Sequence, residues 1–221
     1  MREICTSGST RGSNGIGESR PLLSTLLKWF RKAADQGDAA AQLNLGVAYE
    51  GGHGVTKDVA EAVKWYRKSA KKGDSDAQYN LGLVYANGNG MAQDDAEATK
   101  WFLKSAEQGN PDAQYHLGVF HVIGRGTTPD QAEAVKWFRK AANQGHARAQ
   151  FKLGAAFAMA IGVKQDVPAG YMWLSLSAAA GDAEALKIKT LLAKEITPEQ
   201  IAEAERMAER MVIELKAESK R

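Results

Sequence analysis

The sequence contains a single cysteine, Cys5, and this scarcity excludes several kinds of site. One thiol cannot form an intrachain disulfide, and it cannot supply the set of cysteine ligands that a structural zinc ion needs. The histidines do not compensate, because no two of them stand four residues apart, the spacing that places two ligands on one helical face. They are His53, His116, His121 and His146. We therefore expect no metal and no cofactor.

Long apolar runs and catalytic motifs are also missing. No apolar stretch approaches the roughly 20 residues of a membrane-spanning helix, and residues 1–20 lack the apolar centre of a secretion signal. The chain has neither a Gly-x-Ser-x-Gly motif nor a Gly-Lys-Ser/Thr phosphate loop. The net charge is +3, and no compact basic run is interleaved with aromatic residues. We expect no membrane insertion, no nucleic-acid partner and, from the chain as printed, a cytoplasmic protein.

What the chain does contain is a unit that repeats every 36 residues. The unit Ala41–Asp76 recurs at 77–112, at 113–148 and more loosely at 149–184, and its second half also precedes it at 22–40. All five tryptophans stand in this register, and we assign them to the structural core: Trp29, Trp65, Trp101, Trp137 and Trp173. A fixed period of this size, without gaps, predicts stacked repeats that share one continuous core.

The first half of each unit is predicted to be a helix. In the first unit it runs from about Asp38 to Glu50, with Ala41, Leu45 and Tyr49 on one apolar stripe. A glycine lies inside this helix in every unit, at Gly46, Gly82, Gly118 and Gly154. Because such a glycine costs a helix about 1 kcal/mol relative to alanine, its recurrence predicts that a backbone or a large ring lies against it. The tryptophan of the second helix is the obvious candidate.

The second half of each unit is predicted to be a helix capped at both ends. Asp58, with Glu61 three residues later, has the pattern of a capping box, and Gly73 suits the left-handed residue that ends a helix. The same carboxylate pair recurs in the next two units, at Asp94 with Glu97 and at Asp130 with Glu133. Because capping accounts for these pairs, we do not assign acid–base catalysis to them.

The end of the chain has the features of a helical cap. The second helix of the last unit, 171–180, carries almost no charge, so we expect the tail to cover it. Ala185–Lys194 begins like another first helix, and Thr197-Pro198 starts a long amphipathic helix that reaches about Ser219. The chain thus divides into a disordered segment 1–20, a repeat region 21–184 and a cap 185–221.

The unit A-x-x-x-L-G-x-x-Y-x-x-G-x-G-V-x-x-D-x-x-E-A-x-x-W-Y/F-x-K-A-A-x-x-G resembles the Sel-1-like repeat (SLR) family, a relative of the tetratricopeptide repeat. The resemblance covers 22–184. It implies an all-α, right-handed α-solenoid that scaffolds proteins or binds peptides. Bacterial members are often periplasmic or secreted. Some cysteine-rich members have been described as weak β-lactamases, but those carry a cysteine pair in each repeat, which this chain does not.

Analogy with peptide-binding tetratricopeptide repeats also suggests a site. The column before each Leu-Gly pair would face the concave groove, and it consists of Asn44, Asn80, His116 and Lys152. An asparagine amide can both accept from and donate to an extended peptide backbone, and Lys152 and His116 would attract a carboxylate. The alternative is that these are ordinary exposed polar residues. The neighbouring column is either groove wall or interhelix core: Leu43, Tyr79, Tyr115 and Phe151.

The sequence therefore favours a non-enzymatic module that binds a peptide or protein in the groove of a solenoid. Two alternatives stay open. One is a hydrolase of β-lactams or peptidoglycan, and the other is a structural subunit whose groove is filled by a second copy rather than a monomer. The identity of the partner does not follow from the residues.

Overall fold

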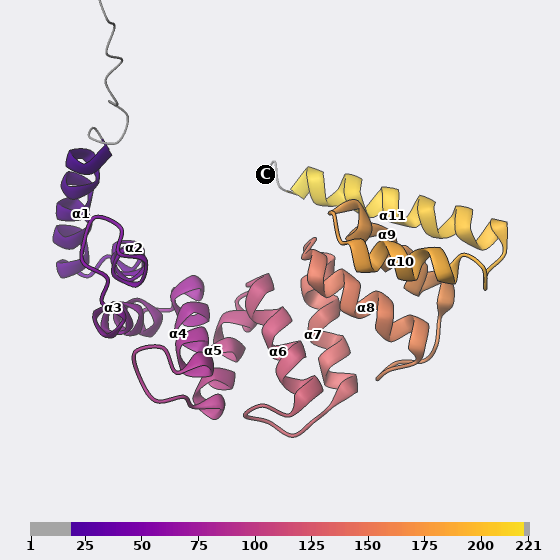
Figure 1. Cartoon of the computed structure of the whole chain (residues 1–221), viewed down its shortest axis with the longest axis horizontal. Helices are drawn as coiled ribbons and strands as arrows, with labels where there is room; N and C mark the ends of the chain where they lie inside the picture. Colours follow the sequence, from indigo (N-terminus) through magenta and orange to yellow (C-terminus); the bar gives the residue numbers. More distant parts are fainter. Residues whose placement is uncertain (1–18, 219–221) are drawn as a thin grey trace, which may run out of the picture.

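The computed structural model describes residues 19–218, and within that range the chain forms eleven α-helices and no strand (Figure 1). Four helix pairs make the repeats: α2 (Ala39–Gly51) with α3 (Val59–Lys71), α4 (Ser75–Asn87) with α5 (Asp95–Glu107), α6 (Pro111–Ile123) with α7 (Gln131–Asn143), and α8 (Ala147–Met159) with α9 (Val167–Ala179). They are preceded by α1 (Ser19–Asp35) and followed by α10 (Ala183–Leu192) and α11 (Pro198–Glu218). The pairs follow one another along an arc, which confirms the predicted all-α solenoid.

The two ends differ in what covers them. The helix α11 packs against α9 and buries its own Ala204 and Ala208. The Tyr171 hydroxyl of α9 donates to the Glu205 carboxylate of α11 at 3.1 Å. The low charge of α9 is explained by this cover, as the sequence indicated. The segment predicted to be disordered, 1–20, lies outside the described residues except for Ser19 and Arg20, which begin α1.

The aspartate caps form as predicted, but the full capping box does not. The Asp58 side chain accepts from the Glu61 N–H at 2.9 Å. The Asp58 N–H, however, donates to the carbonyl oxygen of Tyr49 in the preceding helix at 2.9 Å, and Glu61 pairs with Lys64 at 2.8 Å. The same arrangement recurs at Asp94 and Asp130. Each aspartate therefore joins the two helices of its repeat as well as capping one of them.

A ring does lie against three of the four glycines of the first helices, Gly46, Gly82 and Gly118, but it is not the tryptophan. A Cβ added at Gly82 would lie 2.6 Å from the Phe102 ring, and one at Gly46 would lie 2.5 Å from the Tyr66 ring. The residue after each tryptophan makes this contact. Because neighbouring side chains of a helix point about 100° apart, Tyr66 faces its own repeat while Trp65 faces backward, where it packs with Leu27 and other residues of α1 and α2.

The tryptophans are not equally buried, which corrects the assignment of all five to the core. Trp65, Trp137 and Trp173 are buried, Trp101 is half-buried, and Trp29 is 65% exposed. The reason follows from the backward direction of these rings. Trp29 lies in α1, and no described helix precedes α1 to receive its ring.

Glutamine side chains join successive repeats through a buried polar ladder that the sequence analysis missed. Gln78 is buried, and its Nε2 donates to the Ala70 carbonyl oxygen at 3.1 Å. Its Oε1 accepts from Gln108 of the same repeat at 2.7 Å. The pattern recurs 36 residues later, where Gln144 donates to Gln114 at 2.8 Å. Because a buried amide without partners would destabilise the fold, this ladder specifies how one repeat sits on the next.

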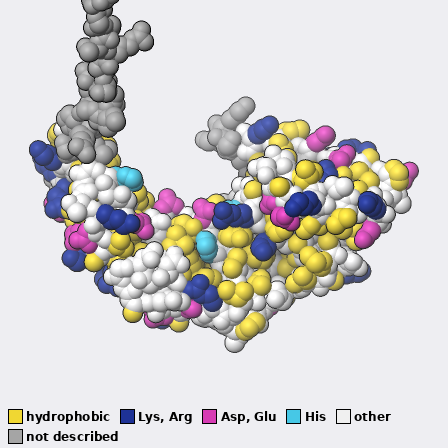
Figure 2. All heavy atoms as spheres, viewed as in Figure 1, with side chains coloured by type: hydrophobic (Ala, Val, Ile, Leu, Met, Phe, Trp, Pro, Cys, Tyr) yellow, Lys and Arg dark blue, Asp and Glu magenta, His cyan; other side chains and the backbone are white. Residues whose placement is uncertain are grey.

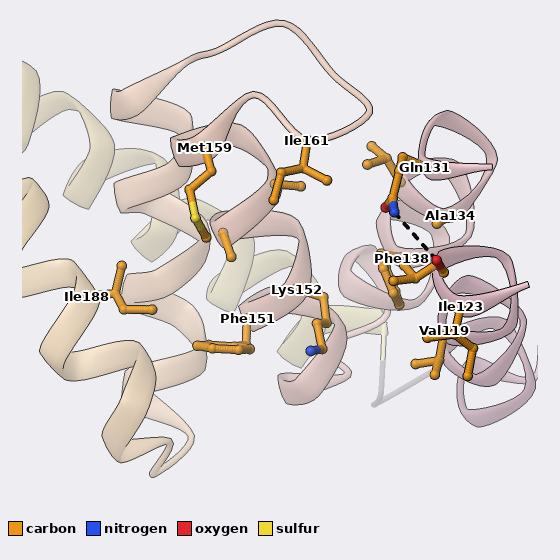
Figure 3. Close-up of a pocket in the computed structure, with 14 residues that line it drawn as sticks. Val119, Ile123, Gln131, Ala134, Phe138, Phe151, Lys152, Met159, Ile161 and Ile188 are labelled. Atoms are coloured by element: carbon orange, nitrogen blue, oxygen red, sulfur yellow. Dashed lines mark hydrogen bonds between the residues drawn. The ribbon is translucent and has the colours of Figure 1, made fainter. Parts of the chain in front are cut away.

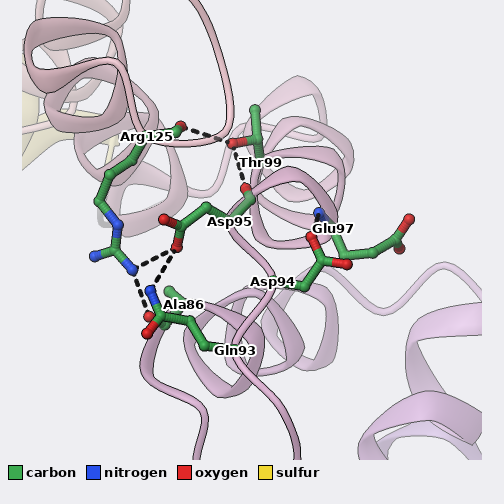
Figure 4. A network of polar contacts seen from close by, with 7 residues as sticks. All are labelled: Ala86, Gln93, Asp94, Asp95, Glu97, Thr99 and Arg125. Carbon is green, nitrogen blue, oxygen red and sulfur yellow. Dashed lines mark hydrogen bonds and ion pairs between the residues drawn. The ribbon is translucent and has the colours of Figure 1, made fainter.

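Arg125, in the loop between α6 and α7, ties this loop to the preceding repeat (Figure 4). Its guanidinium donates to the Ala86 carbonyl oxygen and to the Asp95 carboxylate, and the latter bond lowers the pKa of Asp95. The Thr99 hydroxyl donates to the Arg125 carbonyl oxygen at 3.3 Å. The next residue, Gly126, has a φ of +63°, and a Cβ there would lie 2.0 Å from the Asp95 carbonyl oxygen. This loop therefore requires glycine for both its conformation and its space.

The direction of the tryptophan rings predicts a graded response to truncation. Trp137→Ala should lower the free energy of unfolding by about 3–5 kcal/mol, because it removes a large ring that is only 6% exposed. Trp29→Ala should change it by less than about 1 kcal/mol. Urea unfolding followed by circular dichroism measures both. Similar losses for the two variants would contradict the assignment of Trp29 to an uncovered helix.

The end of α3 provides a second test. Gly73 has a φ of +96°, and a Cβ there would meet nothing within 4 Å, so only the conformation opposes a side chain. Gly73→Ala should cost about 1 kcal/mol of unfolding free energy. Gly73→Asn should cost less, since asparagine tolerates the left-handed region better. A neutral or stabilising alanine in the same urea assay would show that the helix end changes conformation.

Candidate functional site

The four residues predicted to contact a ligand lie at equivalent positions of α2, α4, α6 and α8. Each is followed by a buried leucine, so the core lies on the other side of the helix. Asn44 and Lys152 are exposed, and Asn80 and His116 are half-buried. The structure thus places the column on one continuous surface, the exposed side of α2, α4, α6, α8 and α10, which we call the first-helix face. Contact with a ligand there stays a prediction.

An apolar column runs beside the polar one on the same face, and the sequence analysis missed it. It lies three residues further along each first helix and consists of Val47, Leu83, Val119, Ala155 and Leu191. None of these side chains is buried, and Val47 is 41% exposed. One turn later α6 and α8 add Ile123 and Met159, which are 56% and 57% exposed. The sequence could have indicated this column, because Val47 is apolar but does not lie on the helical stripe of Ala41, Leu45 and Tyr49 that was assigned to the core.

The first-helix face deepens into a groove between α6 and α8. This groove has a volume of about 340 Å³ (Figure 3). Val119 and Ile123 of α6 form one wall, and Phe151 and Met159 of α8 form the other, with Phe138 of α7 between them. Ile188 of α10 and Ile161 of the loop after α8 also line the groove, as does Gln131 of α7. The Gln131 amide donates to the Val122 carbonyl oxygen at 3.5 Å. The space-filling view shows hydrophobic side chains gathered over these central and C-terminal helices (Figure 2).

Lys152 is the sole charged residue that lines this groove. Its Nζ lies 5.7 Å from the centroid of the Phe151 ring, and among residues 19–218 no carboxylate pairs with it. Arg148 lies one turn earlier on α8, is exposed and likewise has no carboxylate partner in that range. The groove is therefore apolar with positive charge at one end.

His116 lies among aromatic rings rather than in open solvent. Its ring stacks on Phe102 at a centroid distance of 5.2 Å and lies 5.6 Å from the rings of Tyr79 and Tyr115. Burial lowers the pKa of His116, although the nearby Asp112 carboxylate acts in the opposite direction. The lowered pKa favours the neutral imidazole at pH 7, which weakens the attraction for a carboxylate that the sequence analysis assigned to His116. Within the predicted column, positive charge then comes mainly from Lys152.

Two other kinds of site have no candidate in the described part of the chain. Residues 19–218 contain no group of three or more His, Cys, Asp or Glu side chains placed to hold a metal ion. None of the described helices combines the length and the apolar character that crossing a membrane requires.

Comparison with known proteins identifies the repeat. The Sel1 repeat family model matches five consecutive segments, 27–38, 39–74, 75–110, 111–146 and 147–182. The chain belongs to the Sel1 repeat family. Proteins of this family are generally protein-interaction modules without enzymatic activity. No curated protein matches the chain.

Several solved structures share this Sel1 repeat fold. A Sel1 repeat protein from Oxalobacter formigenes is 34% identical, with a TM-score of 0.71 over 84% of this chain and 76% of its own. A protective antigen of uropathogenic Escherichia coli strains with an SLR fold is 27% identical, with a TM-score of 0.59 over 88% of this chain. The chain spans half the length of that antigen. An immunity protein from Pseudomonas aeruginosa, 20% identical with a TM-score of 0.50 over 94% of this chain and 77% of its own, shares the fold alone.

The burial of His116 predicts a pH-dependent term in stability. Its folded-state pKa should lie below the ordinary value of about 6.5. The unfolded chain then binds the proton more readily, so the stability that His116 contributes is present above pH 6.5 and is lost as the pH falls through its folded pKa. NMR titration of the His116 ring measures the shift directly. A pKa at or above 6.5 would contradict the dominance of burial.

Proposed function

We propose that this protein is a non-enzymatic scaffold that binds a peptide segment of a partner protein along the first-helix face. The observation that carries the proposal is the pairing of two columns on that face. One offers polar side chains, among them the amides of Asn44 and Asn80, and the other offers apolar side chains that the fold leaves uncovered. An extended peptide presents the same two kinds of group, since its backbone needs hydrogen bonds and its side chains need apolar contacts.

The physical logic of the repeat supports this function. A solenoid buries its core between neighbouring repeats, so the face that does not take part in stacking is open along its whole length. Exposed apolar side chains that gather on one surface are typical of interaction sites. Hydrolysis of β-lactams or peptidoglycan has no comparable support, because the cysteine pairs of the relatives described as β-lactamases are absent from the sequence.

Affinity capture from a lysate of the source cells tests the proposal. The native protein is compared with a variant in which the predicted column is replaced by alanine: Asn44→Ala, Asn80→Ala, His116→Ala and Lys152→Ala. A partner held by the native chain should be lost from this variant while circular dichroism shows that it is still folded. The reason is that the variant loses hydrogen-bonding groups from the face but no fully buried side chain.

A matched control carries three substitutions on the second helices, Lys64→Ala, Lys100→Ala and Lys136→Ala. These side chains are exposed and form only surface ion pairs, which contribute little to stability. The control should keep the partner. Capture by all three proteins would place binding elsewhere, and light scattering over a concentration series would show whether the captured partner is a second copy of this chain.

A further inference from the structure

The first-helix face is not uniform along the solenoid. At its last turn, α2 and α4 end in Gly51 and Asn87, whereas α6 and α8 carry Ile123 and Met159 at the equivalent positions. The apolar column also runs through the groove between α6 and α8, which Val119 and Ala155 both line. Apolar surface is therefore concentrated at the third and fourth repeats.

The size of this groove limits what it can hold. At about 340 Å³ it lies at the lower end of the range of ligand pockets. Its walls come from α6, α7, α8 and α10, and apart from Gln131 and Lys152 they present only aliphatic, methionine and phenylalanine side chains. Such a lining offers few hydrogen bonds to a polar cofactor. It fits one or two large apolar side chains of a peptide that continues along the face.

Charge complementarity specifies the second part of the ligand. Lys152 lies at the edge of the groove, and Arg148 lies one turn closer to the start of α8. Neither cation has a carboxylate partner among the described residues, and the nearby Asp112 carboxylate instead accepts a hydrogen bond from His146 Nε2 at 3.2 Å. The lowered pKa of His116 favours its neutral form, so this side chain adds little to the charge. The end of the groove towards the helix N-termini is thus suited to an anion.

From these observations we infer that the groove between α6 and α8 binds a peptide segment in which one or two large apolar side chains stand next to an aspartate or glutamate. The apolar side chains enter between Val119, Ile123 and Met159, and the carboxylate contacts Lys152. This inference rests on the proposed function and makes it specific: it names the repeats that contact the partner and the chemistry that they select.

Selection from a phage library of random dodecapeptides on the immobilised full-length chain provides the ligands for the test. Selected peptides should be enriched in large apolar residues within a few positions of an acid. One selected peptide is then synthesised, together with a version in which its acid is changed to the matching amide. Fluorescence anisotropy measures the affinity of both for the native chain and for each variant.

Met159→Glu should weaken binding of the selected peptide at least tenfold, because it places a charge inside the apolar groove. Leu103→Glu is the matched control: Leu103 is an exposed apolar residue of the second helix α5, so it lies outside both the first-helix face and the groove. It should change the affinity by less than about twofold.

The amide version of the peptide should bind the native chain about three- to tenfold more weakly than the acid version. This difference in affinity should vanish in Lys152→Met, as expected for a direct charge pair.

The outcomes separate this inference from the proposed function. If the peptide binds the native chain and Met159→Glu with equal affinity, the groove is not its binding site. If the acid and amide peptides bind with equal affinity, Lys152 does not contact the carboxylate. A library that yields no peptide above background overturns both parts. If Met159→Glu still captures the lysate partner that the fourfold alanine variant loses, the scaffold function stands and the groove is not its site. If neither variant loses that partner, both proposals fail.

Discussion

The contact between a helical glycine and an aromatic ring organises each repeat. Gly82 lets Phe102 lie directly on the backbone of α4, which brings the two helices of the repeat together and sets the rotation of the second helix. With that rotation set, the tryptophan one residue earlier must point about 100° away, into the preceding repeat. A single close approach therefore determines both the pairing within a repeat and the stacking between repeats.

The last repeat shows the same constraint through an exchange of residues. There Leu174 replaces the ring, and a Cβ on Gly154 would lie 2.7 Å from its Cγ. The smaller side chain would leave space between α8 and α9, but the alanine that faces the first helix elsewhere becomes Gly170. A Cβ on Gly170 would lie 3.0 Å from the Gly154 carbonyl oxygen. The loss of the ring at Leu174 thus coincides with the loss of a methyl group at Gly170, where the α8 backbone leaves no room for a Cβ without a shift.

Sequence periodicity was enough to predict the helices, the aspartate caps and the exposed side of the polar column, because these depend on local spacing. It did not predict which of two adjacent aromatic residues contacts the glycine. A period of 36 shows which residues of different repeats are equivalent, but it does not show in which direction their side chains point. Nor did it predict that Trp29 is exposed. Trp29 occupies the same position in the repeat as the buried tryptophans, but no described helix precedes α1 to cover its ring. The apolar column was missed because the sequence analysis followed the core stripe of Ala41, Leu45 and Tyr49 and assigned no role to apolar residues beside it such as Val47, although much of a folded protein's surface is apolar.

The division of labour within each repeat makes the first helices suited to the proposed function. Positions that join helices keep their chemistry from one repeat to the next, as Gln42, Gln78, Gln114 and Gln150 do. Positions on the first-helix face vary freely in charge and size, as Asn44, Asn80, His116 and Lys152 do. Variation at Asn44 and Lys152 does not disturb stacking because their side chains are exposed, whereas His116 also packs on Phe102. The solenoid can therefore hold different chemistry at each repeat of its open face, and the junction of α6 and α8 is where that chemistry becomes apolar and positively charged.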